Sequence, residues 1–196
     1  MPVEGSSSQN QDKTMNYAIS GVKEHGDLSV NAGAFANNYR NEPDKFNPNA
    51  PPYSAAGGSI GVAHAAGHAA SLSAQHIPSF GNQVTAAANV NVLATDNHRV
   101  DANAFTTHSM PKGPMPAFQT HGGGVDYQFK ETLKASATMS HTPMFNQTNY
   151  GVSTGVNLHR TPTSSLDFNV GANRTDTQFG RGQWQQNAFF GLKKQF

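Results

Sequence analysis

The sequence has no cysteine, which excludes a disulfide framework, a thiolate metal site and a cysteine nucleophile. Charged residues make up only 13% of the chain and hydrophobic residues 36%, and both shares are low for a globular protein. The opening residues, MPVEGSSSQNQDK, lack the apolar segment of a signal peptide. No run of about eighteen apolar residues is present, so we expect no transmembrane helix.

Apolar residues instead recur at every second position. The alternation is clearest in Val84–Val92, Val125–Phe129, Tyr150–Leu158 and Leu166–Ala172, and polar or small residues fill the positions between. Segments with one apolar and one polar face are typical of β-strands. The sequence therefore predicts an all-β fold, an antiparallel meander of about ten strands that is curled into a barrel-like or sandwich sheet.

The same alternation predicts which side chains are buried. In a soluble sheet the apolar positions lie inside, so they should be far less exposed than their polar neighbours. The residues expected to be buried are Val156, Leu158, Phe168 and Val170. Those expected to be exposed are Asn157, Asp167 and Asn169.

The N-terminal segment differs in composition from the rest. Residues 1–14 hold little that can be buried, so we expect this segment to be disordered. Residues 15–196 are expected to form a single β domain, whose last strand includes Phe189–Gln195.

The stretch Gly61–His76 is ambiguous, because its alanines favour a helix while its alternation favours a strand. We interpret it as a strand.

The chain also repeats itself. HIPSFGNQ, residues 76–83, matches HTPMFNQ, residues 141–147, with one residue deleted. Beyond the deletion the similarity continues, as VDAN at 100–103 corresponds to LDFN at 166–169. We therefore predict two related units at about 76–130 and 141–196.

Two patterns that could carry chemistry lack the residues that such chemistry needs. His64 and His68 could hold one metal ion on a helix, but on a strand they would lie about 13 Å apart. HGGG at 121–124 has neither the spacing of a phosphate loop nor a G-x-S-x-G nucleophile motif to accompany it. We therefore predict no enzyme activity, no metal or cofactor site, no small-molecule substrate and no nucleic-acid partner.

Several stretches, taken in order, resemble the attacins, the glycine-rich antibacterial proteins of insects. They are AQHIPSFGNQVTAAANVNV (74–92), DNHRVDANAF (96–105), GGGVDYQFK (122–130), SATMSHT (136–142), LDFNVGANRTDTQF (166–179) and the closing strand. The resemblance covers roughly residues 28–196. It implies a secreted haemolymph protein of innate immunity that acts without catalysis on the envelope of Gram-negative bacteria. An intracellular form is the alternative, since no signal peptide is visible.

The resemblance implies the bacterial outer membrane, or its lipopolysaccharide, as the partner. Residues 1–97 carry four Lys or Arg against seven Asp or Glu, whereas residues 98–196 carry nine against five. The cationic C-terminal half could therefore be attracted to an anionic surface. The residues expected to make this contact are Lys130, Lys134, Arg174, Arg181, Lys193 and Lys194, with Trp184 as an interfacial anchor.

The sequence leaves two alternative functions. A structural β-barrel of an outer membrane would also show strands of about ten residues and a terminal aromatic residue. An acyl hydrolase is the weakest alternative, because HGGG has no nucleophile motif to accompany it. The sequence does not predict an oligomeric state.

Overall fold

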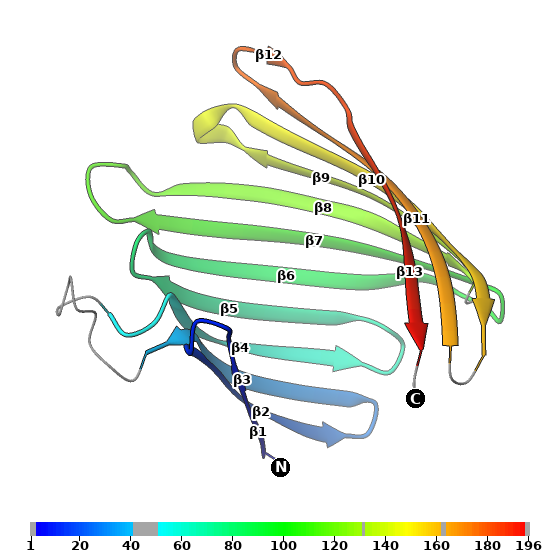
Figure 1. Ribbon diagram of the computed structural model, residues 1–196, viewed down its shortest axis with the longest axis horizontal. Coiled ribbons are helices and arrows are strands. Elements are labelled where there is room, and N and C mark those ends of the chain that lie inside the picture. The colour runs from blue at the N-terminus through cyan, green and yellow to red at the C-terminus, as the bar shows by residue number, and fades with distance from the viewer. Residues whose placement is uncertain (1–2, 41–50, 131, 162–163, 195–196) are drawn as a thin grey trace. The chain divides into compact units, whose positions relative to one another are not determined.

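The computed structural model describes residues 3–40, 51–130, 132–161 and 164–194. Strands dominate this part of the chain, and Figure 1 shows their order along it. The strands are β1 (Val3–Gln9), β2 (Met15–His25), β3 (Leu28–Tyr39), β4 (Ala55–His64), β5 (Ala69–Ile77), β6 (Gly81–Ala94), β7 (His98–Pro111), β8 (Phe118–Phe129), β9 (Leu133–Thr142), β10 (Gln147–Arg160), β11 (Ser164–Thr177), β12 (Gly180–Arg181) and β13 (Gln185–Lys194). One 3-10 turn, η1 (Pro143–Phe145), joins β9 to β10.

The sheet follows the chain, since each strand from β1 to β12 is hydrogen-bonded to its neighbour in sequence. The strand β13 pairs with β11, next to the short strand β12 on the same edge. The predicted all-β antiparallel meander is confirmed. No helix among the described residues has the length and hydropathy needed to cross a membrane.

The described residues form thirteen strands, which exceeds the predicted number of about ten. Gly61–His76 spans the end of β4, a turn and most of β5, so this stretch forms parts of two strands. The two-residue strand β12 is too short to leave a periodic signal. The last strand was predicted to include Phe189–Gln195, and β13 contains this stretch up to Lys194; Gln195 lies outside the described residues.

The N-terminal prediction needs a correction. The segment 1–14 was expected to be disordered, but residues Val3–Gln9 form β1 and pair antiparallel with β2. All seven residues of β1 are exposed, so burial of side chains does not hold this strand. Its backbone hydrogen bonds to β2 do, and the amino-acid composition carries no signal for them.

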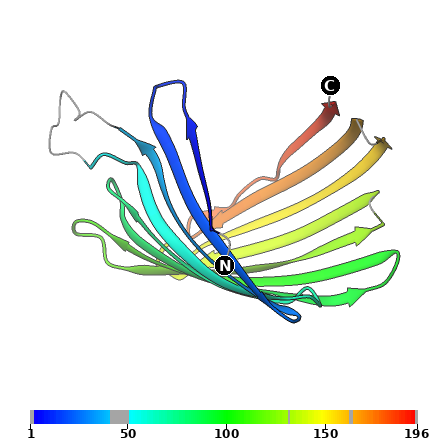
Figure 2. The same ribbon diagram turned by 90° about the horizontal axis from the view of Figure 1, so that it is seen from below.

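The chain folds as two compact units. The first contains residues 1–88 and 106–118, and the second contains residues 89–105 and 119–196. The first unit is built on β1 to β5, paired in sequence order. In the second unit β8, β9, β10, β11 and β13 lie side by side, as Figures 1 and 2 show in light green to red. The single-domain boundary drawn from the sequence stays a prediction.

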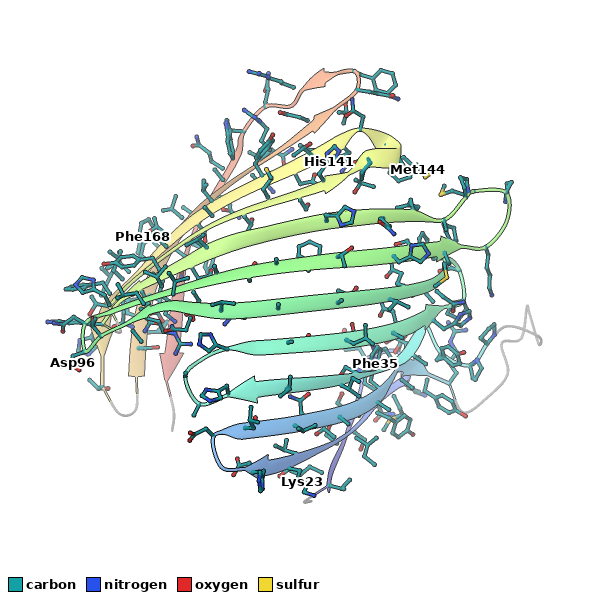
Figure 3. The ribbon with its side chains drawn as sticks, turned by 180° about the vertical axis from the view of Figure 1, so that it is seen from behind. Lys23, Phe35, Asp96, His141, Met144 and Phe168 are labelled. Carbon is teal, nitrogen blue, oxygen red and sulfur yellow. The ribbon has the colours of Figure 1, made fainter. Side chains whose placement is uncertain are left out.

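The two predicted repeats occupy comparable segments. In both, a Pro-x-Phe turn is followed by a 14-residue strand, three connecting residues and a second 14-residue strand. These strands are β6 and β7 in the first copy and β10 and β11 in the second. His141 and Met144, labelled in Figure 3, mark the start of the second copy.

Neither unit has a conventional core. No hydrophobic side chain among the described residues is buried, and the buried polar ones are Thr14, Ser109 and Thr142. The predicted contrast between the two parities is therefore wrong. Leu158 is 55% exposed and Val170 is 37% exposed, whereas the polar residues Asn157, Asp167 and Asn169 are only half-exposed. Val156 and Phe168 are half-exposed as well, like these polar residues.

Candidate functional site

The second unit presents one continuous apolar face. The strand register brings Phe129, Leu133, Val156, Phe168 and Phe190 into one row across the strands. The residues of this apolar face are Val125, Tyr127 and Phe129 on β8, Leu133, Ala135, Ala137 and Met139 on β9, Tyr150, Val152 and Val156 on β10, Leu166, Phe168, Val170 and Ala172 on β11, and Ala188, Phe190 and Leu192 on β13.

The outer strand of the apolar face is its most exposed part. Phe190 is 69% exposed and Leu192 is 77% exposed, although Phe190 stacks on Phe168 with ring centroids 4.7 Å apart. Phe168 is labelled in Figure 3. Side chains of this size are usually covered by protein, and a contiguous exposed set marks an interaction surface.

The opposite, polar face of the second unit is covered by its own hydrogen bonds. Ser136 and Ser153 lie 2.7 Å apart across β9 and β10, and Asn157 donates to Asp167 at 2.7 Å across β10 and β11. Glycines make room for these polar side chains: the Asn169 amide lies against Gly155, where a Cβ would collide with it. Short polar side chains that bond across strands shield one another from water, and this explains why Asn157 and Asp167 are not fully exposed on this face.

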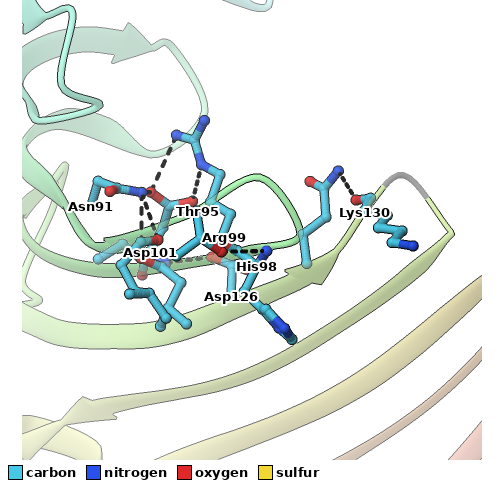
Figure 4. A network of polar contacts seen from close by, with 11 residues as sticks. Asn91, Thr95, His98, Arg99, Asp101, Asp126 and Lys130 are labelled. Atoms are coloured by element: carbon cyan, nitrogen blue, oxygen red, sulfur yellow. Dashed lines mark hydrogen bonds and ion pairs between the residues drawn. The ribbon is translucent and has the colours of Figure 1, made fainter.

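A polar network lies on the same face, near the turn between β6 and β7 (Figure 4). Arg99 Nε donates to Asp101 Oδ2 at 2.6 Å, and Asn91 donates to Asp101 Oδ1 at 2.9 Å. Asn103 donates to Asp126 at 2.9 Å. The hydrogen bond from Arg99, together with that from Asn91, lowers the pKa of the Asp101 carboxyl, and burial opposes this shift.

This lowered pKa makes a testable prediction. A carboxyl with a lowered folded-state pKa stabilises the fold above its unfolded pKa of about 3.9, and the contribution is lost as the pH falls through the folded pKa. We expect Asp101→Asn to lower the melting temperature at pH 7, and the difference from wild type to vanish at about pH 2. Thermal unfolding followed by circular dichroism across this range is the measurement; a difference that stays constant with pH would contradict it.

An arginine lies between two aromatic rings at one end of the apolar face, near the end of β11. The Arg174 guanidinium lies 4.8 Å from the Tyr150 ring centroid and 5.2 Å from that of Trp184. Its Nη2 donates to Asp176 Oδ2 at 3.0 Å, and both side chains of this ion pair are largely covered. Arg174 is therefore tied into the structure by a carboxylate and two rings, and Trp184, 44% exposed, forms the outer side of this cluster.

The structure does not bring the predicted contact residues together. Arg174, Arg181 and Trp184 lie at one end of the strands of the second unit. Lys130 lies at the other end, in the turn after β8, with its Nζ 5.5 Å from the Phe129 ring centroid. Lys193 and Lys194 pair with Ser165 and Ser164 at that same end, and their side chains lie outside the described part of the chain.

Lys134, near the start of β9, is the remaining predicted cation. It lies on the polar face, where it lines a groove of about 290 Å³ together with Asp101, Asp126 and Ser153. Its position beside two carboxylates makes Lys134 a poor candidate for contact with an anionic surface.

The two histidines at spacing four also need a correction. They were expected to lie about 13 Å apart on one strand. A turn between β4 and β5 separates them instead, and their ring centroids lie 6.3 Å apart. His64 Nδ1 accepts a hydrogen bond from the Ala66 backbone N–H at 3.0 Å, so it serves the turn. No group of three potential metal ligands occurs within the described ranges.

Sequence reasoning missed the apolar face itself as the candidate site. The alternation of apolar and polar residues indicated this face, but its apolar residues were predicted to be buried. The cluster around Arg174 was also missed, because Tyr150, Arg174 and Trp184 come from three separate segments that the pairing of β11 with β10 and with β13 brings together.

Comparisons with known proteins identify relatives of this chain. A family model described as "Attacin, C-terminal region" matches residues 78–196. Defense protein 3 of Lonomia obliqua is 42% identical over 143 residues, which cover 72% of this chain and 61% of that protein. Attacin-E of Hyalophora cecropia is 45% identical over 131 residues, which cover 66% of this chain and 56% of that protein. The chain thus spans less than two thirds of the length of these two relatives.

A solved structure with a similar fold is an anion-selective porin from Comamonas acidovorans. The TM-score is 0.60 at 12% sequence identity, and the match covers 91% of this chain and 59% of the porin chain. Porins are antiparallel barrels, so the likeness agrees with the barrel-like form of the predicted sheet. At this identity the likeness concerns the fold alone.

Proposed function

The chain belongs to the attacin family, and from this premise we propose that it is an antibacterial defence protein that acts on the envelope of Gram-negative bacteria. The relatives named as defence protein and attacins support the defence role. One observation supports the bacterial envelope as the target. The second unit has an exposed apolar face, and cationic residues lie at both ends of its strands.

The action that this surface supports is binding, without catalysis. The cations make the first encounter with the phosphates of lipopolysaccharide, and the apolar side chains then hold the protein at the envelope. Such a protein meets bacteria outside the host cell, so we propose secretion into the haemolymph.

A growth assay tests this function. The purified chain is added to matched cultures of a Gram-negative and a Gram-positive bacterium, and growth is followed over a dilution series. We expect inhibition of the Gram-negative culture at concentrations that leave the other unaffected. Inactivity against both, with the protein shown by circular dichroism to be folded, would refute the proposal.

The role of the C-terminal cations can be measured directly. Each Lys near an anionic surface contributes about 1 kcal/mol, so Lys193→Gln with Lys194→Gln should weaken binding to lipopolysaccharide vesicles about 30-fold at low salt. The loss should shrink at physiological ionic strength, where charges are screened over about 8 Å. Lys13→Gln with Lys23→Gln, in the first unit, is the matched control. Equal losses for the two pairs would make the C-terminal position irrelevant.

The alternative of a resident outer-membrane barrel is favoured by one observation, the exposure of apolar side chains on the strands of the second unit. Expression without detergent separates the two proposals. A monodisperse chain in buffer supports the antibacterial effector, whereas a chain that stays in solution only with detergent supports the resident barrel.

A further inference from the structure

We infer that the apolar face of the second unit docks flat on an anionic phospholipid bilayer, with its side chains among the acyl chains and its polar face toward water. The inference rests on the proposed function and deepens it by naming the lipid partner of this face. It goes beyond attraction to lipopolysaccharide, because the contact it describes is apolar and needs no lipopolysaccharide.

The first ground is that large exposed side chains gather on the apolar face, whereas the opposite face of β13 carries the exposed Phe189. Val125, Met139, Val152, Phe190 and Leu192 are each about half exposed or more. Removing such surface from water is worth about 25 cal/mol per Å², so several of these residues acting together suffice for stable association. The polar face offers no comparable set, since its side chains bond to one another.

The second ground is the segregation of charge. The carboxylates Asp101, Asp126 and Asp167 lie on the polar face, where each accepts a hydrogen bond from an asparagine. On the apolar side Asp176 is paired with Arg174, and Asp96 lies in the exposed turn between β6 and β7, outside the strands of this face. A surface with cations and without an unpaired carboxylate is complementary to anionic headgroups, whereas the polar face must stay in water.

The third ground is the arrangement along the strands. From Leu166 to Arg174 the face is about 26 Å long at the usual rise of a strand. Tyr150, Arg174 and Trp184 close one end, and Lys130 follows Phe129 at the other. Tyr, Trp and long cationic side chains reach from apolar surroundings to headgroups, so both ends suit a face that lies in the interface.

Trp184 provides the readout, because it is the only tryptophan of the chain. The full chain is mixed with vesicles of phosphatidylcholine and phosphatidylglycerol that contain no lipopolysaccharide. We expect a blue shift of the Trp184 emission and quenching by phospholipids brominated near the headgroup. Emission that does not change, and is not quenched, at saturating lipid would overturn the inference.

Two adjacent phenylalanines of β13 test which face makes the contact. Phe190 lies on the apolar face and is 69% exposed, whereas Phe189 lies on the opposite face and is 58% exposed. We expect Phe190→Asp to weaken vesicle binding at least about tenfold and Phe189→Asp to change it less than about twofold. Both changes introduce the same charge on the same strand, so only the face differs.

The outcomes separate this inference from the proposed function. Equal binding of the two variants, or a larger loss for Phe189→Asp, would overturn the inference, even if bacterial growth is still inhibited. If Phe190→Asp disturbs folding, Leu192→Asp takes its place, because Leu192 is 77% exposed and tolerates a polar side chain in the free protein. Vesicle binding through the apolar face without any inhibition of growth would support the inference and refute the function.

Discussion

Replacing Gly81 by alanine is expected to destabilise the first unit by more than about 3 kcal/mol. Gly81 has a φ of 137°, which an L-residue rarely adopts, and it is buried at the start of β6. A Cβ at this position would collide with the Met110 carbonyl oxygen and would lie 3.0 Å from the Lys112 nitrogen. These are backbone atoms, so no side-chain rotation relieves the contact. Urea denaturation followed by circular dichroism measures the change.

Gly26 is the matched control for this prediction. It also has a positive φ, of 58°, but no atom lies within 4 Å of the position that a Cβ would take. Gly26→Ala should therefore cost only the strain of the left-handed conformation, about 1 kcal/mol. An equal loss in the free energy of unfolding for the two variants would show that the close approach of Met110 to Gly81 does not affect stability.

Replacing Arg174 by alanine is expected to cost about 2 kcal/mol and to change the Trp184 emission. The substitution removes the cation between Tyr150 and Trp184 and leaves the Asp176 carboxylate, which is only 20% exposed, without its ion-pair partner. Asp176 also accepts from the Gly182 N–H at 3.2 Å, so the connection between β12 and β13 should loosen. Fluorescence and urea denaturation of the same sample report both effects.

Arg181→Ala provides the comparison for Arg174. Arg181 is exposed on β12, and no side-chain hydrogen bond, ion pair or ring contact within the described residues involves it. Removing it should change stability by less than about 0.5 kcal/mol and leave the tryptophan spectrum as it was. A loss as large as that of Arg174→Ala would show that net charge, and not the cluster around Trp184, governs stability.

The period-two pattern predicted the strands of the second unit and their antiparallel order, because alternation is a local property of the chain. It did not predict which parity is exposed. Alternation in Tyr150–Leu158 separates two faces, but burial depends on what covers each face. The polar side chains cover one another here through bonds such as that of Asn157 to Asp167.

Strand register and turns, which the sequence pattern does not reveal, decide which residues of the candidate site come together. Nothing in the spacing of Tyr150, Arg174 and Trp184 indicates that they meet, because the pairing of β11 with β10 and with β13 decides it. His64 and His68 come together for the same reason: a turn falls between them, where the sequence was interpreted as a continuous strand. The cationic character of the C-terminal half was visible in the sequence, but its division between two strand ends was not.

The sequential strand order has a consequence for how the chain acquires its structure. Because β8 to β11 each pair with the strand that precedes or follows them in the chain, the native pairings of the second unit connect residues that are close in sequence. The loops that must close are short, and β13 reaches β11 after only the few residues around β12. Chains with such local pairings cross lower entropic barriers than sheets with long connections. Pairing can therefore proceed hairpin by hairpin, each formed on the microsecond scale and each offering an edge to the strand that follows.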